Sequence, residues 1–239
     1  MINFLLDILI PQQICCLCRT PGNYKRRQPW CNECLKKLRD LQTTAPICQK
    51  CGKYLCEEKT ICIDCSTMNP TFHIARAVGP YEDTYRIAIK VLKFLGRKHL
   101  SIIMGYMMAE VARAEPEFWP IDILVPVPIS EGSLKQRGFN QTEVLAKEIS
   151  KHIKTKVDSK SLIRVKETPS QRELSREERE KNLLCAFQLK DNSKVKGKNV
   201  LLIDDVYTTG STSKECTRVL LEGGAQRVSV LTWATGKGN

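Results

Sequence analysis

Residues 200–212 read VLLIDDVYTTGST. Four apolar residues precede two adjacent acids, Asp204 and Asp205, and a turn rich in hydroxyl side chains follows. A short apolar run of this kind is typical of a strand buried in a parallel sheet. The polar residues after it indicate a tight turn and a helix that begins near Thr212. The stretch therefore predicts two carboxylates at the carboxyl end of a buried strand, beside the start of a helix.

Two kinds of polar group meet in this stretch. Amides at a helix start, together with Thr and Ser hydroxyls, can hold a phosphate, and Gly210 allows the backbone to approach it closely. Carboxylates are unsuited to phosphate but accept hydrogen bonds from sugar hydroxyls. A ribose 5-phosphate presents both groups. A metal-binding acid pair and a plain helix cap are the alternatives, and the length of the fitting stretch favours the sugar phosphate.

The segments around this stretch alternate between strand and helix patterns. Residues 121–127, 185–189, 199–203 and 228–234 have the composition of strands, and residues 129–139 are expected to form a loop. Helices are predicted at residues 84–95 and 99–114, and a third one after Asn140, where Glu143 stands at capping-box spacing. This alternation predicts an α/β fold with a mostly parallel sheet flanked by helices.

The cysteines mark a separate module. Ten of the 12 lie between Cys15 and Cys65, and eight of these form C-x-x-C pairs. Two such pairs can complete a tetrahedral site of four thiolates, a spacing typical of structural zinc. Consecutive pairing predicts two sites, and an interleaved pairing satisfies the same spacing. The predicted ligands are Cys15, Cys18, Cys31 and Cys34 for one site, and Cys48, Cys51, Cys62 and Cys65 for the other.

Two structural zinc ions would fold a segment too short to build its own core. Four sulfurs leave no open coordination position, so the zinc is expected to be structural rather than catalytic. We therefore predict a zinc-binding module at residues 1–70 and a second domain at residues 71–239. A nucleic-acid or partner surface on the ribbons is the alternative use of the module.

The 239 residues carry a formal charge of +12, and residues 71–239 hold +8 of it. A basic excess favours phosphate-bearing ligands or nucleic acid. The first ten residues are apolar, but Asp7 and Pro11 argue against a signal peptide or a membrane span. Without an export signal we expect a cytoplasmic protein with reduced thiols.

Residues 166–181 are almost wholly polar and include Gln171, Arg172, Arg176 and Arg179. Such a segment is either an exposed connector or a mobile lid that carries cations to a phosphate.

Residues 200–212 resemble the phosphoribosyl pyrophosphate (PRPP) signature of type I phosphoribosyltransferases. Further residues resemble the competence protein F family (ComF and ComFC), in which a zinc module precedes a phosphoribosyltransferase domain. The residues that carry this second resemblance are Leu92, Lys93, Phe94, Gly96, Val125–Pro128, Arg137, Gly138, Phe139, Asn140, Gln141, Gln171, Arg179 and Asn182.

The resemblance implies a binding role for each residue of the signature. Asp204 and Asp205 would bind the ribose hydroxyls. If the protein is catalytic, Arg137 together with Arg179, or with Arg172 or Arg176, would hold the pyrophosphate with Mg²⁺. The 5-phosphate would lie among Thr208, Thr209, Gly210, Ser211 and Thr212.

It also implies a cytoplasmic role in natural transformation, with single-stranded DNA and the ComFA ATP-dependent translocase as partners. Few residues follow the last predicted strand, so an acceptor would be held by the zinc module or the first helices. Three functions stay open: a PRPP- and DNA-binding competence factor, an active transferase with an unidentified acceptor, and a zinc-ribbon nucleic-acid-binding protein.

Overall fold

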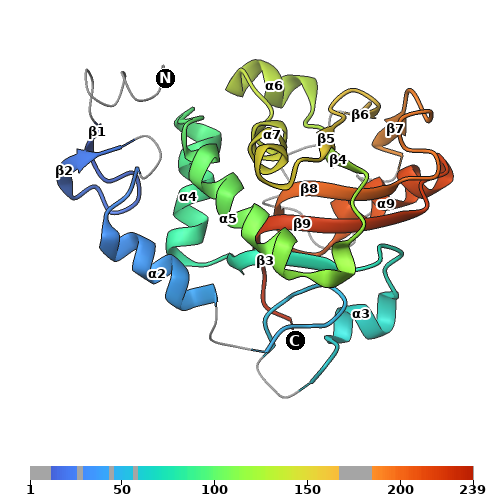
Figure 1. Cartoon of the computed structure of the whole chain (residues 1–239), viewed down its shortest axis with the longest axis horizontal. Helices are drawn as coiled ribbons and strands as arrows, with labels where there is room; N and C mark the ends of the chain where they lie inside the picture. Colours follow the sequence, from blue (N-terminus) through green and yellow to red (C-terminus); the bar gives the residue numbers. More distant parts are fainter. Residues whose placement is uncertain (1–11, 26–28, 43–45, 56–58, 167–184, 239) are drawn as a thin grey trace.

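The computed structural model describes residues 12–25, 29–42, 46–55, 59–166 and 185–238. A five-stranded sheet lies at its centre, with the strand order β3–β9–β8–β4–β5 (Figure 1). Every neighbouring pair in this sheet is parallel, which confirms the predicted α/β fold. The strands are β3 (Ala75–Pro80), β9 (Arg227–Thr235), β8 (Asn199–Tyr207), β4 (Ile123–Pro126) and β5 (Lys156–Val157).

The central strand β8 is buried on both faces, which explains its continuous apolar sequence. Leu201 and Ile203 belong to one buried cluster, and Val200 and Leu202 belong to the other. Side chains therefore alternate between two cores on opposite faces of the sheet.

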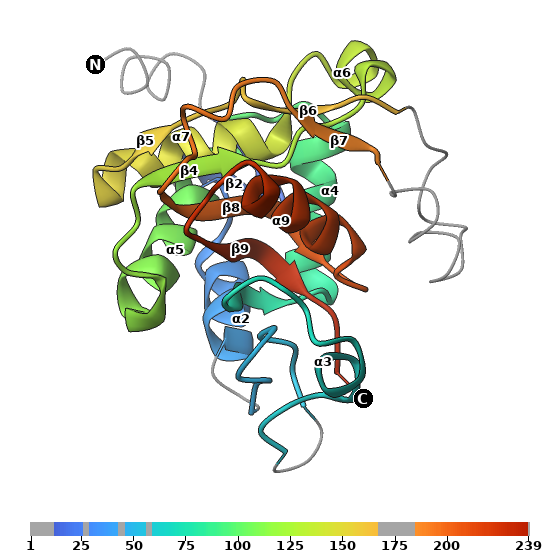
Figure 2. The ribbon, with the colours of Figure 1, turned by 90° about the vertical axis from the view of Figure 1, so that its right-hand side faces the viewer.

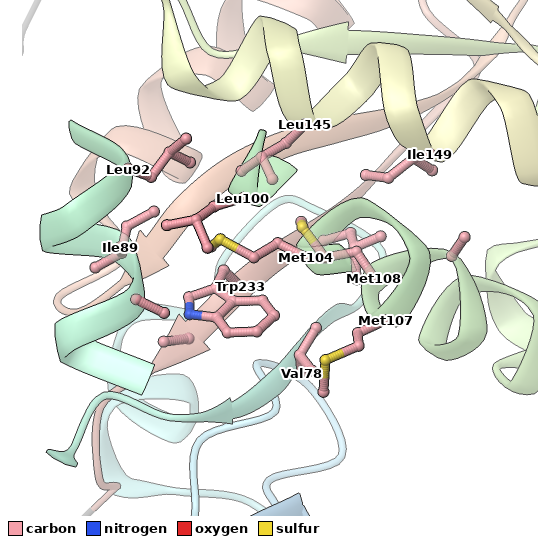
Figure 3. Close-up of a cluster of buried hydrophobic side chains, with 14 of the residues drawn as sticks. Val78, Ile89, Leu92, Leu100, Met104, Met107, Met108, Leu145, Ile149 and Trp233 are labelled. Carbon is pink, nitrogen blue, oxygen red and sulfur yellow. The ribbon is translucent and has the colours of Figure 1, made fainter. Parts of the chain in front are cut away.

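One core lies under the helices α4 (Asp83–Phe94), α5 (Leu100–Ala114) and α7 (Gln141–Ile153), and we call this side the α5 face. Figure 3 shows Trp233 of β9 among side chains of α4, α5 and β3. Its indole Nε1 donates to the backbone oxygen of Tyr85 at 3.0 Å, so the polar end of this buried ring is satisfied. At Gly105 a Cβ would lie 2.4 Å from the Glu148 Cβ, so glycine lets α5 approach α7 closely.

The opposite core lies under α9 (Ser211–Glu222), and we call this side the α9 face. In Figure 2, α9 is drawn in front of β8 and β9. A two-stranded antiparallel sheet of β6 (Leu162–Arg164) and β7 (Phe187–Leu189) packs on the same core.

The cysteine-rich segment contributes to both cores. Its first part comprises β1 (Gln12–Ile14), β2 (Pro21–Tyr24) and α2 (Asn32–Gln42), and it packs on the α5 face through Cys15, Cys34 and Leu38. Its second part contains α3 (Ile63–Met68) and packs on the α9 face through Cys48, Cys51, Cys62 and Cys65. The two cysteine clusters therefore lie on opposite faces of one sheet.

Several local expectations need correction. The predicted loop at residues 129–139 contains the helix α6 (Glu131–Arg137), which Ser130 caps by accepting from the Ser133 amide at 3.3 Å. This short helix buries no residue, so it has no apolar stripe by which to predict it.

The predicted strand at 185–189 does form, as β7, but outside the parallel sheet. The strands β3, β5 and β6 were not predicted, nor was the short 3₁₀ turn η1 (Pro116–Phe118). Asn140 does cap α7, accepting from the Thr142 amide at 3.1 Å, but Glu143 pairs with Lys147. No helix in the described ranges is long and apolar enough to cross a membrane.

Candidate functional site

The acid pair lies in the last part of β8, before the strand ends at Tyr207. The strand is therefore longer than the predicted residues 199–203. Asp204 is 8% exposed and Asp205 is 6% exposed. Asp204 Oδ1 accepts a hydrogen bond from the Asp205 amide at 2.8 Å. Burying two adjacent carboxylates costs free energy unless each has a hydrogen-bond or ion-pair partner, so the surrounding residues influence their protonation.

Asp205 is held by two neighbouring helices. The Lys93 ammonium, in the last turn of α4, lies 2.6 Å from Asp205 Oδ2. The Gln141 side chain, at the start of α7, donates to the same oxygen at 2.7 Å. Among the described residues both contacts fall on Oδ2, which leaves Oδ1 available as a hydrogen-bond acceptor.

Sequence reasoning did not assign a role to Lys93 or Gln141. Lys93 lies one helical turn after the buried Ile89. A cation on the apolar side of a helix is unusual, and this was the sequence feature that could have indicated a buried partner for Lys93. Gln141 directly follows the capping residue Asn140, where a buried amide side chain is unusual and points to a specific partner.

Arg137 joins the same network. Its guanidinium donates to Gln141 Oε1 at 3.0 Å and lies over the Phe94 ring, 5.3 Å from the ring centroid. Arg137 therefore reaches the acid pair through Gln141. Arg179, the other predicted pyrophosphate ligand, lies outside the described residues, as do Gln171, Arg172, Arg176 and Asn182.

The surroundings of Asp204 change its protonation. Burial raises the pKa of Asp204 to about 7, and the negative charge of Asp205 adds to this rise. The Asp205 amide and the more distant Lys93 charge oppose it only in part. Near neutral pH Asp204 is therefore only partly ionised, and Lys93 lies against the neighbouring carboxylate.

The turn that follows β8 connects directly to the start of α9. Thr209 Oγ1 and Ser211 Oγ lie 2.8 Å apart, and the Ser211 amide donates to Thr209 Oγ1 at 3.4 Å. Gly210 is the N-cap residue, with φ +79°, a backbone conformation that favours glycine. The first amides of the 12-residue helix have no partner within the helix, so this end suits an anion.

The first cysteine cluster consists of Cys15, Cys18, Cys31 and Cys34, whose sulfurs all lie within 4.8 Å of one another. The Cys15–Cys34 and Cys18–Cys31 sulfurs are 3.9 and 3.7 Å apart. A tetrahedral zinc with Zn–S bonds of about 2.3 Å requires sulfur separations of about 3.8 Å, which these distances match. The neighbouring Cys16 is not part of the cluster and accepts from Arg97 at 3.6 Å.

The second cluster consists of Cys48, Cys51, Cys62 and Cys65, and all four are buried. The Cys51 and Cys62 sulfurs lie 3.6 Å apart, and the Cys62 amide points at Cys48 Sγ over 3.4 Å. The cysteines are therefore grouped consecutively, and the interleaved pairing is wrong. Both donor sets fit zinc.

Two family models match the chain. One describes a double zinc ribbon domain and matches residues 5–66, and the other describes a phosphoribosyl transferase domain and matches residues 139–238. The chain is also 31% identical over 223 residues to the DNA utilization protein YhgH of Escherichia coli (strain K12). That match covers 91% of this chain and 94% of the relative.

Two further relatives carry competence names. Competence protein ComFC of Bacillus subtilis (strain 168) is 30% identical over 214 residues, which cover 84% of this chain and 82% of the relative. Competence protein F of Haemophilus influenzae (strain ATCC 51907 / DSM 11121 / KW20 / Rd) is 28% identical over 204 residues, which cover 84% of this chain and 87% of the relative.

The similarity thus spans the cysteine clusters, the acid pair and the hydroxyl-rich turn. The chain belongs to the competence protein F family, which joins a double zinc ribbon to a phosphoribosyltransferase domain.

Proposed function

We propose that the protein binds PRPP with Mg²⁺ at the end of β8 and acts in DNA uptake or utilisation in the cytoplasm. The observation that carries the proposal is the arrangement along β8, where the buried acid pair stands directly before a turn that opens a helix. Sugar hydroxyls and a phosphate of one ligand could engage both parts, since they follow each other at the same edge of the sheet.

Each part of the site has a proposed task. Asp205 Oδ1 and Asp204 accept from the two ribose hydroxyls, while Thr208, Thr209 and the α9 amides hold the 5-phosphate. Lys93 and Gln141 fix the orientation of Asp205. Carboxylates and substrate phosphates are the ligands Mg²⁺ prefers, and the ion would neutralise the pyrophosphate. Arg137 and Arg179 are proposed to hold the same group.

The names of the relatives support a role in handling DNA. We infer that single-stranded DNA and a ComFA-type translocase are the partners of this chain. The charge of residues 71–239 supports the first of these, because cationic surfaces attract the phosphate backbone.

Exposed lysines gather at the amino ends of the sheet strands, away from the acid pair. Lys156 of β5 pairs with Ile123 of β4, which in turn pairs with Val200 near the start of β8. The Lys190 amide donates to the Ser161 oxygen at 2.8 Å, which brings the loop after β7 to this edge. We call this surface the lysine edge. Its exposed lysines are Lys156, Lys160, Lys190, Lys194, Lys196 and Lys198.

The Asp204→Asn, Asp205→Asn double variant should lose PRPP binding. Each carboxylate that accepts a hydrogen bond from the sugar contributes about 1.5–3 kcal/mol, so the loss should be at least about 100-fold. Titration calorimetry with Mg²⁺ and PRPP measures it. Asp191→Asn, on an exposed loop, is the matched control and should bind like the wild type. If the double variant bound PRPP as tightly as the wild type, Asp204 and Asp205 would not bind the ribose.

The Asp204→Asn single variant should become increasingly more stable than the wild type as the pH rises, because the wild type loses stability and the variant does not. The pKa of Asp204 is about 7 in the folded state against 3.8 when unperturbed, so ionisation destabilises the folded wild type between about pH 4 and pH 7. The variant cannot ionise and escapes this loss, which amounts to up to about 4 kcal/mol above pH 7. Urea unfolding at pH 5, 6, 7 and 8 gives the comparison. A difference in free energy of unfolding that does not change with pH would contradict the assigned protonation.

Elemental analysis should find two zinc ions per chain. Cys18→Ser and Cys51→Ser should each lower the content to about one, because three thiolates bind zinc far more weakly than four. Cys185→Ser changes an exposed cysteine outside both clusters and should leave two ions. A wild type that holds one ion would show that one of the clusters is not a metal site.

The Lys190→Glu, Lys194→Glu double variant should bind single-stranded DNA more weakly. Each lost phosphate contact should reduce, by about 0.7, the steepness with which the logarithm of the binding constant falls with the logarithm of the salt concentration. Fluorescence anisotropy with an oligonucleotide at several salt concentrations measures both effects.

Lys36→Glu with Lys37→Glu makes the same charge change on α2, away from the lysine edge, and should have little effect. If both double variants behaved alike, net charge rather than the lysine edge would govern binding.

Pyrophosphate release from Mg²⁺-PRPP, measured with and without the oligonucleotide, separates a binding protein from a transferase that uses DNA as acceptor.

A further inference from the structure

Tyr207 lies between the second cysteine cluster and the phosphate-binding turn. It is the last residue of β8 and directly precedes Thr208. It is 5% exposed and belongs to the same buried cluster as Cys48, Cys51 and Cys62. Tyr207 therefore shares a core with the second zinc ribbon and is next to the turn in the chain.

Side-chain contacts join the ribbon to this tyrosine. The ring of Phe72, which follows the ribbon in the chain, packs edge-on against the Tyr207 ring, with centroids 6.0 Å apart and an interplanar angle of 87°. The Lys53 ammonium lies 6.0 Å from the centroid of the Tyr207 ring. Lys53 is itself buried and pairs with Asp64 Oδ2 at 2.6 Å. Lys53 follows Cys51 by two residues and Asp64 precedes Cys65, so both partners of this ion pair lie beside metal ligands in the chain.

Backbone bonds form a second connection. The Gly236 amide donates to the Tyr207 oxygen at 2.9 Å, and the Gly238 amide donates to the Tyr54 oxygen at 2.8 Å. Tyr54 also forms isolated β-bridges with Ile47 and Lys237. The last residues of the chain therefore link the ribbon backbone to the backbone of Tyr207.

On its other side Tyr207 supports the turn. A Cβ built on Gly210 would lie 2.4 Å from the Tyr207 hydroxyl oxygen, so the phenol occupies the space next to this glycine. Gly210 is the N-cap of α9, and its position sets the direction of the helix amides that follow. A shift of the Tyr207 ring would therefore change the geometry of the phosphate-binding turn.

We propose that Tyr207 is a positioning residue through which metal loading of the second cysteine cluster sets the phosphate-binding turn. The first cluster lies on the α5 face, in the other core, and has no part in this coupling. The proposal rests on the proposed function, because it takes phosphate as the ligand of the turn. Coupling between two sites is reciprocal, so a ligand at the turn should also retain metal in the second cluster.

Hydrogen exchange of the full chain tests the coupling without any ligand. Cys51→Ser, which empties the second cluster, should speed amide exchange at residues 208–213 at least tenfold. Cys18→Ser, which empties the first cluster, should leave it unchanged. Equal exchange at the turn in both variants would overturn the proposal, whatever the fate of PRPP binding.

Tyr207→Leu covers the case in which Cys51→Ser unfolds the ribbon. It should retain two zinc ions, weaken binding of inorganic phosphate and of Mg²⁺-PRPP about tenfold, and speed exchange at the turn. Tyr207→Phe retains the ring and its contact with Phe72, and should restore most of the affinity. If the leucine variant bound phosphate like the wild type, Tyr207 would have no positioning role.

Metal release supplies the reciprocal measurement. In Cys18→Ser only the second cluster holds zinc, and PRPP should slow the transfer of this zinc to a chelator at least threefold. In Cys51→Ser the zinc of the first cluster should leave at the same rate with and without PRPP. If wild-type calorimetry showed no PRPP binding, the proposed function would fail while the exchange result would still decide the coupling. PRPP binding without any effect on zinc release would refute the coupling alone.

Discussion

The Lys93–Asp205 ion pair is the contact on which the site depends. Two adjacent carboxylates are buried at the end of β8, and a buried charge without a partner costs several kcal/mol. Lys93 pairs with Asp205, while burial and the neighbouring Asp205 raise the pKa of Asp204 to about 7. Because Lys93 lies in the last turn of α4 and Gln141 is the first residue of α7, the contacts to Asp205 require α4 to end and α7 to begin at this edge of the sheet. The position of the side chains around Asp205 therefore depends on how α4 and α7 pack on the α5 face.

The two zinc ribbons play different parts in this arrangement. The first packs beside α4 and α5, where Tyr85 donates its hydroxyl hydrogen to the Leu38 oxygen at 2.7 Å. The second packs on the α9 face, next to the residues that lead into the turn before α9. A module that looks like one cysteine-rich unit in the sequence therefore contributes to two separate cores. Arg76 strengthens the second attachment, since its guanidinium bonds both the Glu115 carboxylate and the Gln49 oxygen.

Local patterns predicted the parts of the structure that depend on nearby residues. The strand, turn and helix of residues 200–212 follow from apolar residues and a glycine within one short segment, and the metal ligands follow from cysteines two residues apart. The predictions failed where local signals are weak. The helix α6 has no buried face, β5 has only two residues, and β7 reads like the sheet strands but pairs with β6 instead.

The sequence by itself determined the α/β class, the cysteine ligands and the pairing of an acid pair with a hydroxyl-rich turn, because each depends on the spacing of residues close together in the chain. Only the tertiary structure decided that Lys93 and Gln141 hold Asp205, that the two cysteine clusters lie on opposite faces, and that Tyr207 stands between the second cluster and Gly210. Most of these contacts join distant parts of the chain, as the Gln141–Asp205 and Lys53–Tyr207 pairs, 64 and 154 positions apart, illustrate. No local periodicity encodes such contacts, since they arise only when the sheet brings its strand ends and helix ends to one edge.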